Sequence, residues 1–283
     1  MSLLSAPEPV AAVLERPHSL LEGPRIAPGG ALIYSDVIQG GLWCCRVDGT
    51  IEELLPRRRG IGGVVAHADG GWVISGRSIL HIGPDGAQRE LLSDPEVPGY
   101  NDLGATPSGE LLVGELRYRP MAGEQPREGR LLALGPEGRV RVLSEEVLWP
   151  NGIGVSPDGR RVYFSDYGRR RVLVTEIDGA GAATEVFADA PAGSADGLAV
   201  DGEGGVWVAL GEAGALARFG PEGDLDELVD VPAAFVSSVS FGGADMRDVL
   251  ISTADNELRP ELGGTLLRAR CELAGLALAP VRV

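Results

Sequence analysis

The sequence contains no lysine, since all 25 of its basic residues are arginine. The absence of lysine excludes a Schiff-base mechanism and a Walker-type phosphate loop. With only three histidines and three cysteines, neither a disulfide framework nor an H-E-x-x-H metal site is indicated. No G-x-S-x-G elbow occurs either, so a serine-hydrolase triad has no support in the sequence.

The chain also lacks long hydrophobic runs and a basic surface. The longest early apolar run, Val10 to Leu14, is too short for a signal peptide or a membrane span. A net charge of −16 argues against binding to nucleic acid or to anionic membranes. Cys44 and Cys45 are neighbours on an expected strand and must face opposite ways. We therefore expect reduced cysteines in a cytoplasmic protein. We also expect a monomer.

A pattern that recurs six times organises the rest of the sequence. Each copy has an apolar segment, a turn rich in Gly, Asp and Pro, and a second apolar segment, followed by another such pair. The first halves of the copies lie at 27–36, 67–76, 106–115, 156–166, 201–210 and 241–253. Repeats of 39 to 50 residues, such as these, that each contain four short strands are typical of propeller blades. The sequence therefore predicts an all-β, six-bladed β-propeller that occupies residues 1–283 as a single domain.

Aligning the copies brings polar residues into one column at the start of the innermost strands. The blades begin near residues 22, 62, 101, 151, 196 and 236, and the column reads Glu22, Gly62, Asn101, Asn151, Asp196 and Val236. Propeller symmetry would place the four polar side chains at one end of the central channel. The alternative is that Asn-Gly, Asn-Asp and Asp-Gly are only turns that precede strands.

Two carboxylates and two amides in a narrow channel mouth indicate a divalent cation, because like charges repel strongly at low dielectric. Oxygen donors without Cys or His favour a hard ion. We expect Ca²⁺, with Mg²⁺, Mn²⁺ or Zn²⁺ as alternatives.

The segments around these positions resemble the senescence marker protein, gluconolactonase and luciferin-regenerating enzyme family. They are Leu21–Pro24, Tyr100–Asp102, Pro150–Ile153 and Ala195–Asp201, together with VYFSDYGRRRV and the closing GGTLLRAR. The resemblance implies a six-bladed propeller whose central divalent metal supports lactone hydrolysis. It also implies that Glu22, Asn151 and Asp196 bind the metal and that Asn101 contacts the substrate.

Two positions depart from the family pattern. Sugar-lactonase members commonly carry Arg where this chain has Gly99, which is followed by Tyr100. The acidic substrate contact of the family has no clear match in residues 114–119. The resemblance thus implies an intact metal centre beside an altered substrate pocket.

The expected function is metal-dependent hydrolysis of a lactone or a related small ester. Asp196 would act as general base and Asn101 would stabilise the oxyanion. The loop from Leu116 to Gly129 is the longest interruption of the repeat, with a shorter counterpart at 254–263, and we expect Tyr100, Arg117, Tyr118 and Arg119 near the substrate. The alternative function is a non-catalytic propeller whose ion is structural and which binds a partner or a small molecule.

Three further expectations concern other parts of the chain. Pro9–Glu15 should be a strand that pairs with the last blade and closes the ring. His67 should be a solvated turn residue. Asp36, Glu115 and Asp166, at the ends of second strands, should make structural hydrogen bonds.

Overall fold

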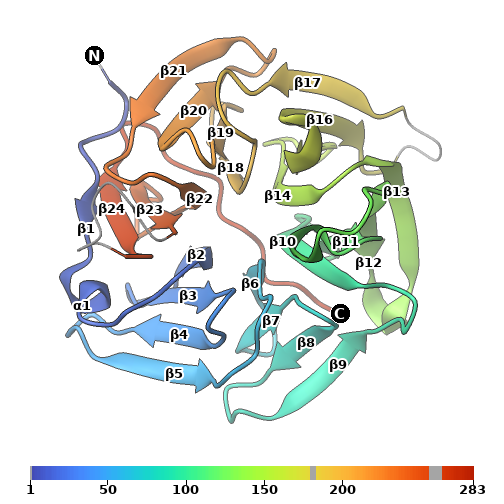
Figure 1. Ribbon diagram of the computed structural model, residues 1–283, viewed down its shortest axis with the longest axis horizontal. Coiled ribbons are helices and arrows are strands. Elements are labelled where there is room, and N and C mark those ends of the chain that lie inside the picture. Colours follow the sequence, from blue (N-terminus) through green and yellow to red (C-terminus); the bar gives the residue numbers. More distant parts are fainter. Residues whose placement is uncertain (1, 179–182, 255–262) are drawn as a thin grey trace.

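The computed structural model describes residues 2–178, 183–254 and 263–283. Within these residues the strands form six four-stranded antiparallel sheets. Figure 1 shows the sheets arranged as blades around a common axis. The predicted six-bladed β-propeller is confirmed.

Five blades follow the chain in simple order, from the innermost strand outward. Blade 1 contains β2 (Leu21–Ile26), β3 (Leu32–Asp36), β4 (Leu42–Cys45) and β5 (Ile51–Leu55). Blade 2 contains β6 (Val64–Ala66), β7 (Trp72–Ile74), β8 (Ile79–Ile82) and β9 (Gln88–Leu92). Blade 3 contains β10 (Gly99–Ala105), β11 (Leu111–Leu116), β12 (Gly129–Leu134) and β13 (Val140–Val147). Blade 4 contains β14 (Pro150–Val155), β15 (Arg161–Asp166), β16 (Arg171–Glu176) and β17 (Glu185–Asp189). Blade 5 contains β18 (Leu198–Val200), β19 (Val206–Ala209), β20 (Ala215–Phe219) and β21 (Leu225–Asp230).

Blade 6 joins the two ends of the chain. It contains β22 (Val236–Gly242), β23 (Asp248–Thr253), β24 (Leu266–Arg270) and, as its outer strand, β1 (Glu8–Pro9). The expected ring closure is therefore confirmed, but the expected strand over Pro9–Glu15 is wrong, since α1 occupies Ala11–Leu14. Ala and Leu favour a helix, and this turn buries Val13 completely. Because the first strand completes the last blade, we propose that residues 1–283 form one domain.

The hydrophobic core lies between neighbouring blades. One cluster joins Trp207 and Leu216 of blade 5 to Val236 and Ile251 of blade 6. Another joins Leu112 and Leu131 of blade 3 to Ile153 and Phe164 of blade 4. Outer strands such as β9 and β21 are largely exposed. The blades thus stabilise one another through their faces and leave the channel free for polar groups.

The last residues of the chain form a strap, residues 271–283, instead of the further strand that the repeat predicts. After β24 the chain crosses the central channel (Figure 1). Its backbone donates from Leu276 N to Val200 O at 2.9 Å and from Val281 N to Ala66 O at 2.9 Å. The strap therefore links blades 5 and 2 across one mouth of the channel.

Three smaller expectations can be compared with the structure. Cys44 and Cys45 face different hydrophobic clusters, and all three cysteines are free and buried. His67 does lie at a turn, but the solvated environment expected for it is wrong, since the side chain is buried and stacks on His81 with ring centroids 3.9 Å apart. Among the described residues, no helix is long and apolar enough to cross a membrane.

Candidate metal and lactone site

The four polar residues of the sequence column meet at one mouth of the channel. Glu22 lies on β2, Asn101 on β10, Asn151 on β14 and Asp196 just before β18. They line a single cavity of about 270 Å³. Apolar residues make up most of its remaining wall: Leu20, Val37, Met121, Trp149, Tyr167, Phe235 and Ala254.

Three of these residues, Glu22, Asn101 and Asn151, lie in strands and not in turns. Asn101 and Asn151 are inside β10 and β14, so the view that their dipeptides are only turns before strands is wrong for both. The pairing register shifts beside the column in blades 1, 3 and 4: between Glu22 and Arg25, Tyr100 and Leu103, and Pro150 and Ile153. Such bulges redirect side chains. The same irregularity thus accompanies three of the four column residues, Glu22, Asn101 and Asn151.

Glycines beside the column let the inner strands approach one another closely. A Cβ at Gly152 would lie 2.2 Å from Leu198 N of the next blade, and a Cβ at Gly197 would lie 2.1 Å from Ser238 Oγ. In blade 2 a Cβ at Gly62, the column position itself, would lie 2.7 Å from Asn101 Oδ1. Blade 2 thus leaves room for the amide of Asn101.

Burial and neighbouring carboxylates perturb both acidic groups of the site. Burial raises the pKa of Glu22 well above its ordinary value, and the nearby charges of Asp196 and Asp102 raise it further. Burial, Asp102 and Glu212 likewise raise the pKa of Asp196 well above its ordinary range. Negative charge is therefore expensive here without a cation.

Asp102, which follows Asn101 in β10, interacts electrostatically with Arg25 of β2. Burial raises the pKa of Asp102 to about 6, although the positive charge of Arg25 opposes that shift. Arg25 donates from Nη1 to Pro24 O at 2.7 Å, while its buried Nε has no hydrogen-bond partner among the described residues. Arg25 thus places a positive charge near the acidic groups of the mouth.

Hydrogen bonds orient the two amides. Asn101 Nδ2 donates to Pro150 O of the next blade at 2.9 Å. The amide of Asn151 hydrogen-bonds to Asp196 and opposes the rise of its pKa. Asp196 Oδ1 is buried without a hydrogen-bond partner in the described structure, an arrangement that is costly unless another ligand approaches that oxygen.

The donor set fits a hard divalent ion. Carboxylate and amide oxygens converge, one carboxylate oxygen is unpartnered, and the raised pKa values report uncompensated negative charge. No cluster of three or more His, Cys, Asp or Glu residues suited to a metal occurs in the described ranges. A cation at this mouth would therefore need the amide oxygens as well as the carboxylates.

The loop residues expected near the substrate lie elsewhere in the described structure. Tyr100 packs in the core of blades 2 and 3, and Tyr118 is buried near Asp166. Arg117 lines a separate surface pocket with Glu115 and Arg130, and Arg119 pairs with Glu124 at 2.7 Å. From this loop, Met121 alone lines the cavity with the column residues. The counterpart loop at 254–263 lies, except for its first and last residues, outside the described residues.

The acidic residues at the ends of second strands make structural contacts. Asp36 accepts backbone hydrogen bonds from Ser19, Ile38 and Gln39. Glu115 forms a bidentate pair with Arg130, at 2.7 and 2.9 Å. Asp166 pairs with Arg169 and Arg171, which accounts for two arginines of the basic run 169–171.

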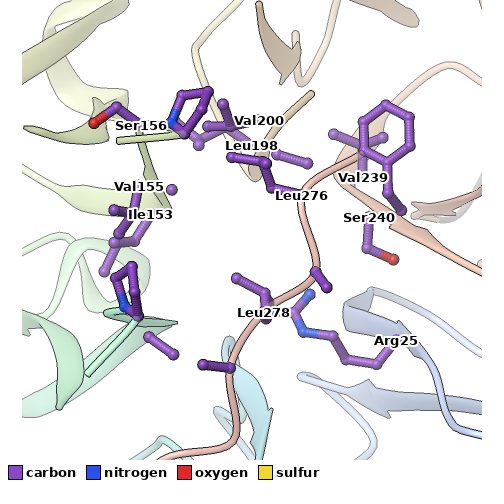
Figure 2. A pocket seen from close by; sticks show the side chains of 18 residues that line it. Arg25, Ile153, Val155, Ser156, Leu198, Val200, Val239, Ser240, Leu276 and Leu278 are labelled. Atoms are coloured by element: carbon purple, nitrogen blue, oxygen red, sulfur yellow. The ribbon is translucent and has the colours of Figure 1, made fainter. Parts of the chain in front are cut away.

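The opposite mouth of the channel contains cavities of different character. Two cavities, of about 260 and about 630 Å³, flank the strap. Figure 2 shows Arg25 beside Leu278 of the strap, and Ile153 and Val155 on the other side of the first cavity. None of the four column residues lines either of these cavities. The four column residues therefore face the other mouth, which the strap leaves open.

Comparison with known proteins identifies the family. Residues 20–255 match the SMP-30/Gluconolactonase/LRE-like region. The chain belongs to this family. The resemblance inferred from the sequence is thereby confirmed.

Relatives within the family carry lactonase names. A 6-deoxy-6-sulfogluconolactonase of Pseudomonas putida is 28% identical over 292 residues, which cover 95% of this chain and 97% of that protein. Pentonolactonase XacC of Haloferax volcanii is 34% identical over 179 residues, which span 61% of this chain and 60% of that relative. The solved structure of a calcium-binding protein, regucalcin, from Agrobacterium tumefaciens superimposes with a TM-score of 0.84 at 23% identity, covering 99% of this chain and 98% of that one.

Sequence reasoning missed several residues of this family member's site. The positions that follow the column residues are Gly23, Gly63, Asp102, Gly152, Gly197 and Ser237. Asp102 is the one acidic residue among them, and this departure was the available signal for its place in the channel. Arg25 and the aromatic walls gave no comparable signal, because their place depends on how neighbouring blades meet.

Proposed function

We propose that this protein hydrolyses a lactone, or a related small ester, at the channel mouth formed by Glu22, Asn101, Asn151 and Asp196. The observation that carries the proposal is the pair of buried carboxylates with raised pKa values, one of them with an unpartnered oxygen, beside two oriented amides. The lactonase names of the relatives support the same reaction.

We propose a divalent cation as the cofactor, with Glu22, Asn151 and Asp196 as the residues that would hold it. Ca²⁺ is favoured by the all-oxygen donor set and by the calcium-binding regucalcin neighbour. When bound, such an ion polarises a carbonyl oxygen and acidifies water. It would also compensate the negative charge that burial makes costly at this mouth.

Asp196 is the proposed general base. A base that takes a proton near neutral pH works best with a pKa close to that pH, and burial moves the pKa of Asp196 upward. The proton removed from the attacking water would reside on this carboxylate and then pass to the ring oxygen as the acyl C–O bond breaks. The overall change adds one water to the lactone and gives a hydroxy acid.

Asn101 is the proposed oxyanion donor. Its hydrogen bond to Pro150 O fixes the amide plane and uses one of the two N–H groups of Nδ2. The other N–H can donate to a carbonyl oxygen as negative charge develops there. A donor of this kind contributes on the order of 10²-fold in rate.

The first test is a panel of aldonolactones, simple γ- and δ-lactones and aryl esters, assayed on metal-stripped protein with Ca²⁺, Mg²⁺, Mn²⁺ or Zn²⁺ restored. We expect metal-dependent turnover that falls by at least about 10²-fold in Asp196→Asn, because general-base catalysis contributes roughly 10²- to 10⁴-fold. Asp158→Asn, at an exposed turn where Asp158 accepts a hydrogen bond from Ser156, is the matched control. Absence of turnover on every substrate, with metal still raising Tm, would instead support a non-catalytic propeller with a structural ion.

A further inference from the structure

The wall around the reactive groups is apolar and aromatic. The cavity is lined by Leu20 and Val37 of blade 1, by Met121 of blade 3, and by Phe235, before β22, and Ala254, after β23, of blade 6. Of the described lining residues outside the polar column, Tyr167 alone carries a hydrogen-bonding side-chain group besides the indole N–H of Trp149. A bound molecule would therefore meet hydrocarbon on most sides.

Trp149 and Tyr167 form one continuous aromatic wall. Both lie at the site end of blade 4, where Trp149 precedes β14 and Tyr167 follows β15. Their ring centroids are 4.6 Å apart at an interplanar angle of 49°. Burial raises the pKa of Tyr167 to about 12, and its hydroxyl hydrogen-bonds to Ser194. The hydroxyl of Tyr167 thus already has a hydrogen-bond partner, and its ring is the part that a bound molecule would contact.

No guanidinium lines this cavity among the described residues. Gly99 has no side chain to offer, and a Cβ there would meet Gly76 O at 3.2 Å. Arg119 is paired with Glu124, and Arg169 with Glu128 and Asp166. The arginines two residues from Met121 and from Tyr167 are therefore committed to other partners.

These contacts match a substrate poor in hydroxyl groups. A polyhydroxylated lactone would bury several hydroxyls against Trp149, Phe235 and Val37 without partners for them, and unpaired buried polar groups cost free energy. A ring that carries an aryl or alkyl substituent would instead remove apolar surface from water on both sides.

We infer that the substrate is a lactone with an apolar aryl or alkyl substituent, and that the wall of Trp149 and Tyr167 determines this specificity. The inference rests on the proposed lactonase function. It assigns the reacting carbonyl to the polar column and the substituent to the aromatic wall.

The test compares kcat/KM for dihydrocoumarin and a pentyl-substituted δ-lactone with kcat/KM for glucono-1,5-lactone. We expect the apolar lactones to be preferred by at least tenfold. Trp149→Ala should lower the ratio of apolar to sugar lactone by about 10- to 100-fold, and Trp149→Phe should retain most of it, because the contact is made by an aromatic face. Trp72→Ala, which changes a tryptophan in the cavity at the opposite mouth, is the matched control and should leave the ratio unchanged.

The outcomes separate the inference from the proposed function. Preference for glucono-1,5-lactone, or an equal loss on both lactone classes in Trp149→Ala, would overturn the inference while the lactonase function stands. Absence of hydrolysis of any lactone would overturn the proposed function itself. In that case, calorimetric binding of a pentyl-substituted δ-lactam, lost in Trp149→Ala, would still support an apolar ligand at this wall, and absence of binding would overturn that too.

Discussion

At the scale of single residues, the site concentrates negative charge where water is scarce. Glu22, Asp102 and Asp196 are all buried, and for each of them burial is the largest cause of a raised pKa. Arg25 is the nearby cation that opposes this shift at Glu22 and Asp102. The chain has three asparagines, and two of them lie at this mouth. These acidic and amide residues are thus placed to offer oxygen atoms to a ligand, and not to stabilise the fold.

The raised pKa of Asp102 predicts how the metal-free protein responds to pH. Its folded pKa of about 6 lies above the ordinary value of 3.8, so its contribution to stability is fully present below that ordinary value and is lost as pH rises through 6. We expect Asp102→Asn to reduce the loss of unfolding free energy between pH 4 and pH 7 by up to about 3 kcal/mol. Urea denaturation in EDTA at both pH values measures this. An undiminished loss in the variant would show that Asp102 is not the group responsible.

At the scale of strands, the site depends on how closely the inner strands pack around the channel. The bulges in β2, β10 and β14 turn polar side chains inward, and glycine next to the column lets one strand touch the next. At Gly152 the nearest atoms to an added Cβ all belong to the backbone of residues 196–198, which cannot rotate away. The same contact sets the spacing of Asn151 from Asp196.

Gly152→Ala should therefore push blades 4 and 5 apart. We expect a destabilisation of about 1–3 kcal/mol or more, the usual cost of overpacking, together with weakened metal binding. Gly135→Ala is the matched control, because its Cβ would meet the flexible end of Glu110 at 3.3 Å and would lie in ordinary contact, 3.7 Å, with the backbone at Arg139 O. Equal urea midpoints for the two variants would show that the strand contact does not constrain the site.

The sequence predicted the parts of this architecture that repeat locally. Alternating apolar segments and Gly/Asp turns reflect local hydrogen bonding, so the blade starts near 22, 101, 151 and 236 agree with β2, β10, β14 and β22. The strap could not be predicted, because its backbone hydrogen bonds can be made by almost any residue. The sites of Arg117 and Arg119 depend on ion pairs that only tertiary contact selects.

At the scale of the whole molecule, the propeller divides its channel into two different ends. The strap covers the mouth beside Arg25, Leu276 and Leu278, while the acidic groups face the other mouth. The six blades form a ring in which β1 completes the last sheet. Four of these blades supply the polar side chains that line one cavity. The ring thus provides a rigid frame in which mutual repulsion of carboxylates can be tolerated until a cation binds.

Calorimetric titration of Ca²⁺ into metal-stripped protein tests this site most directly. We predict binding of one ion per chain in the wild-type protein and in Asp158→Asn, and loss of at least about 100-fold in affinity in both Glu22→Gln and Asp196→Asn, since each removes one of the two carboxylates. Circular dichroism should show both variants folded. Binding that is absent in the wild type, or unchanged in these two variants, would contradict a cation site at this mouth.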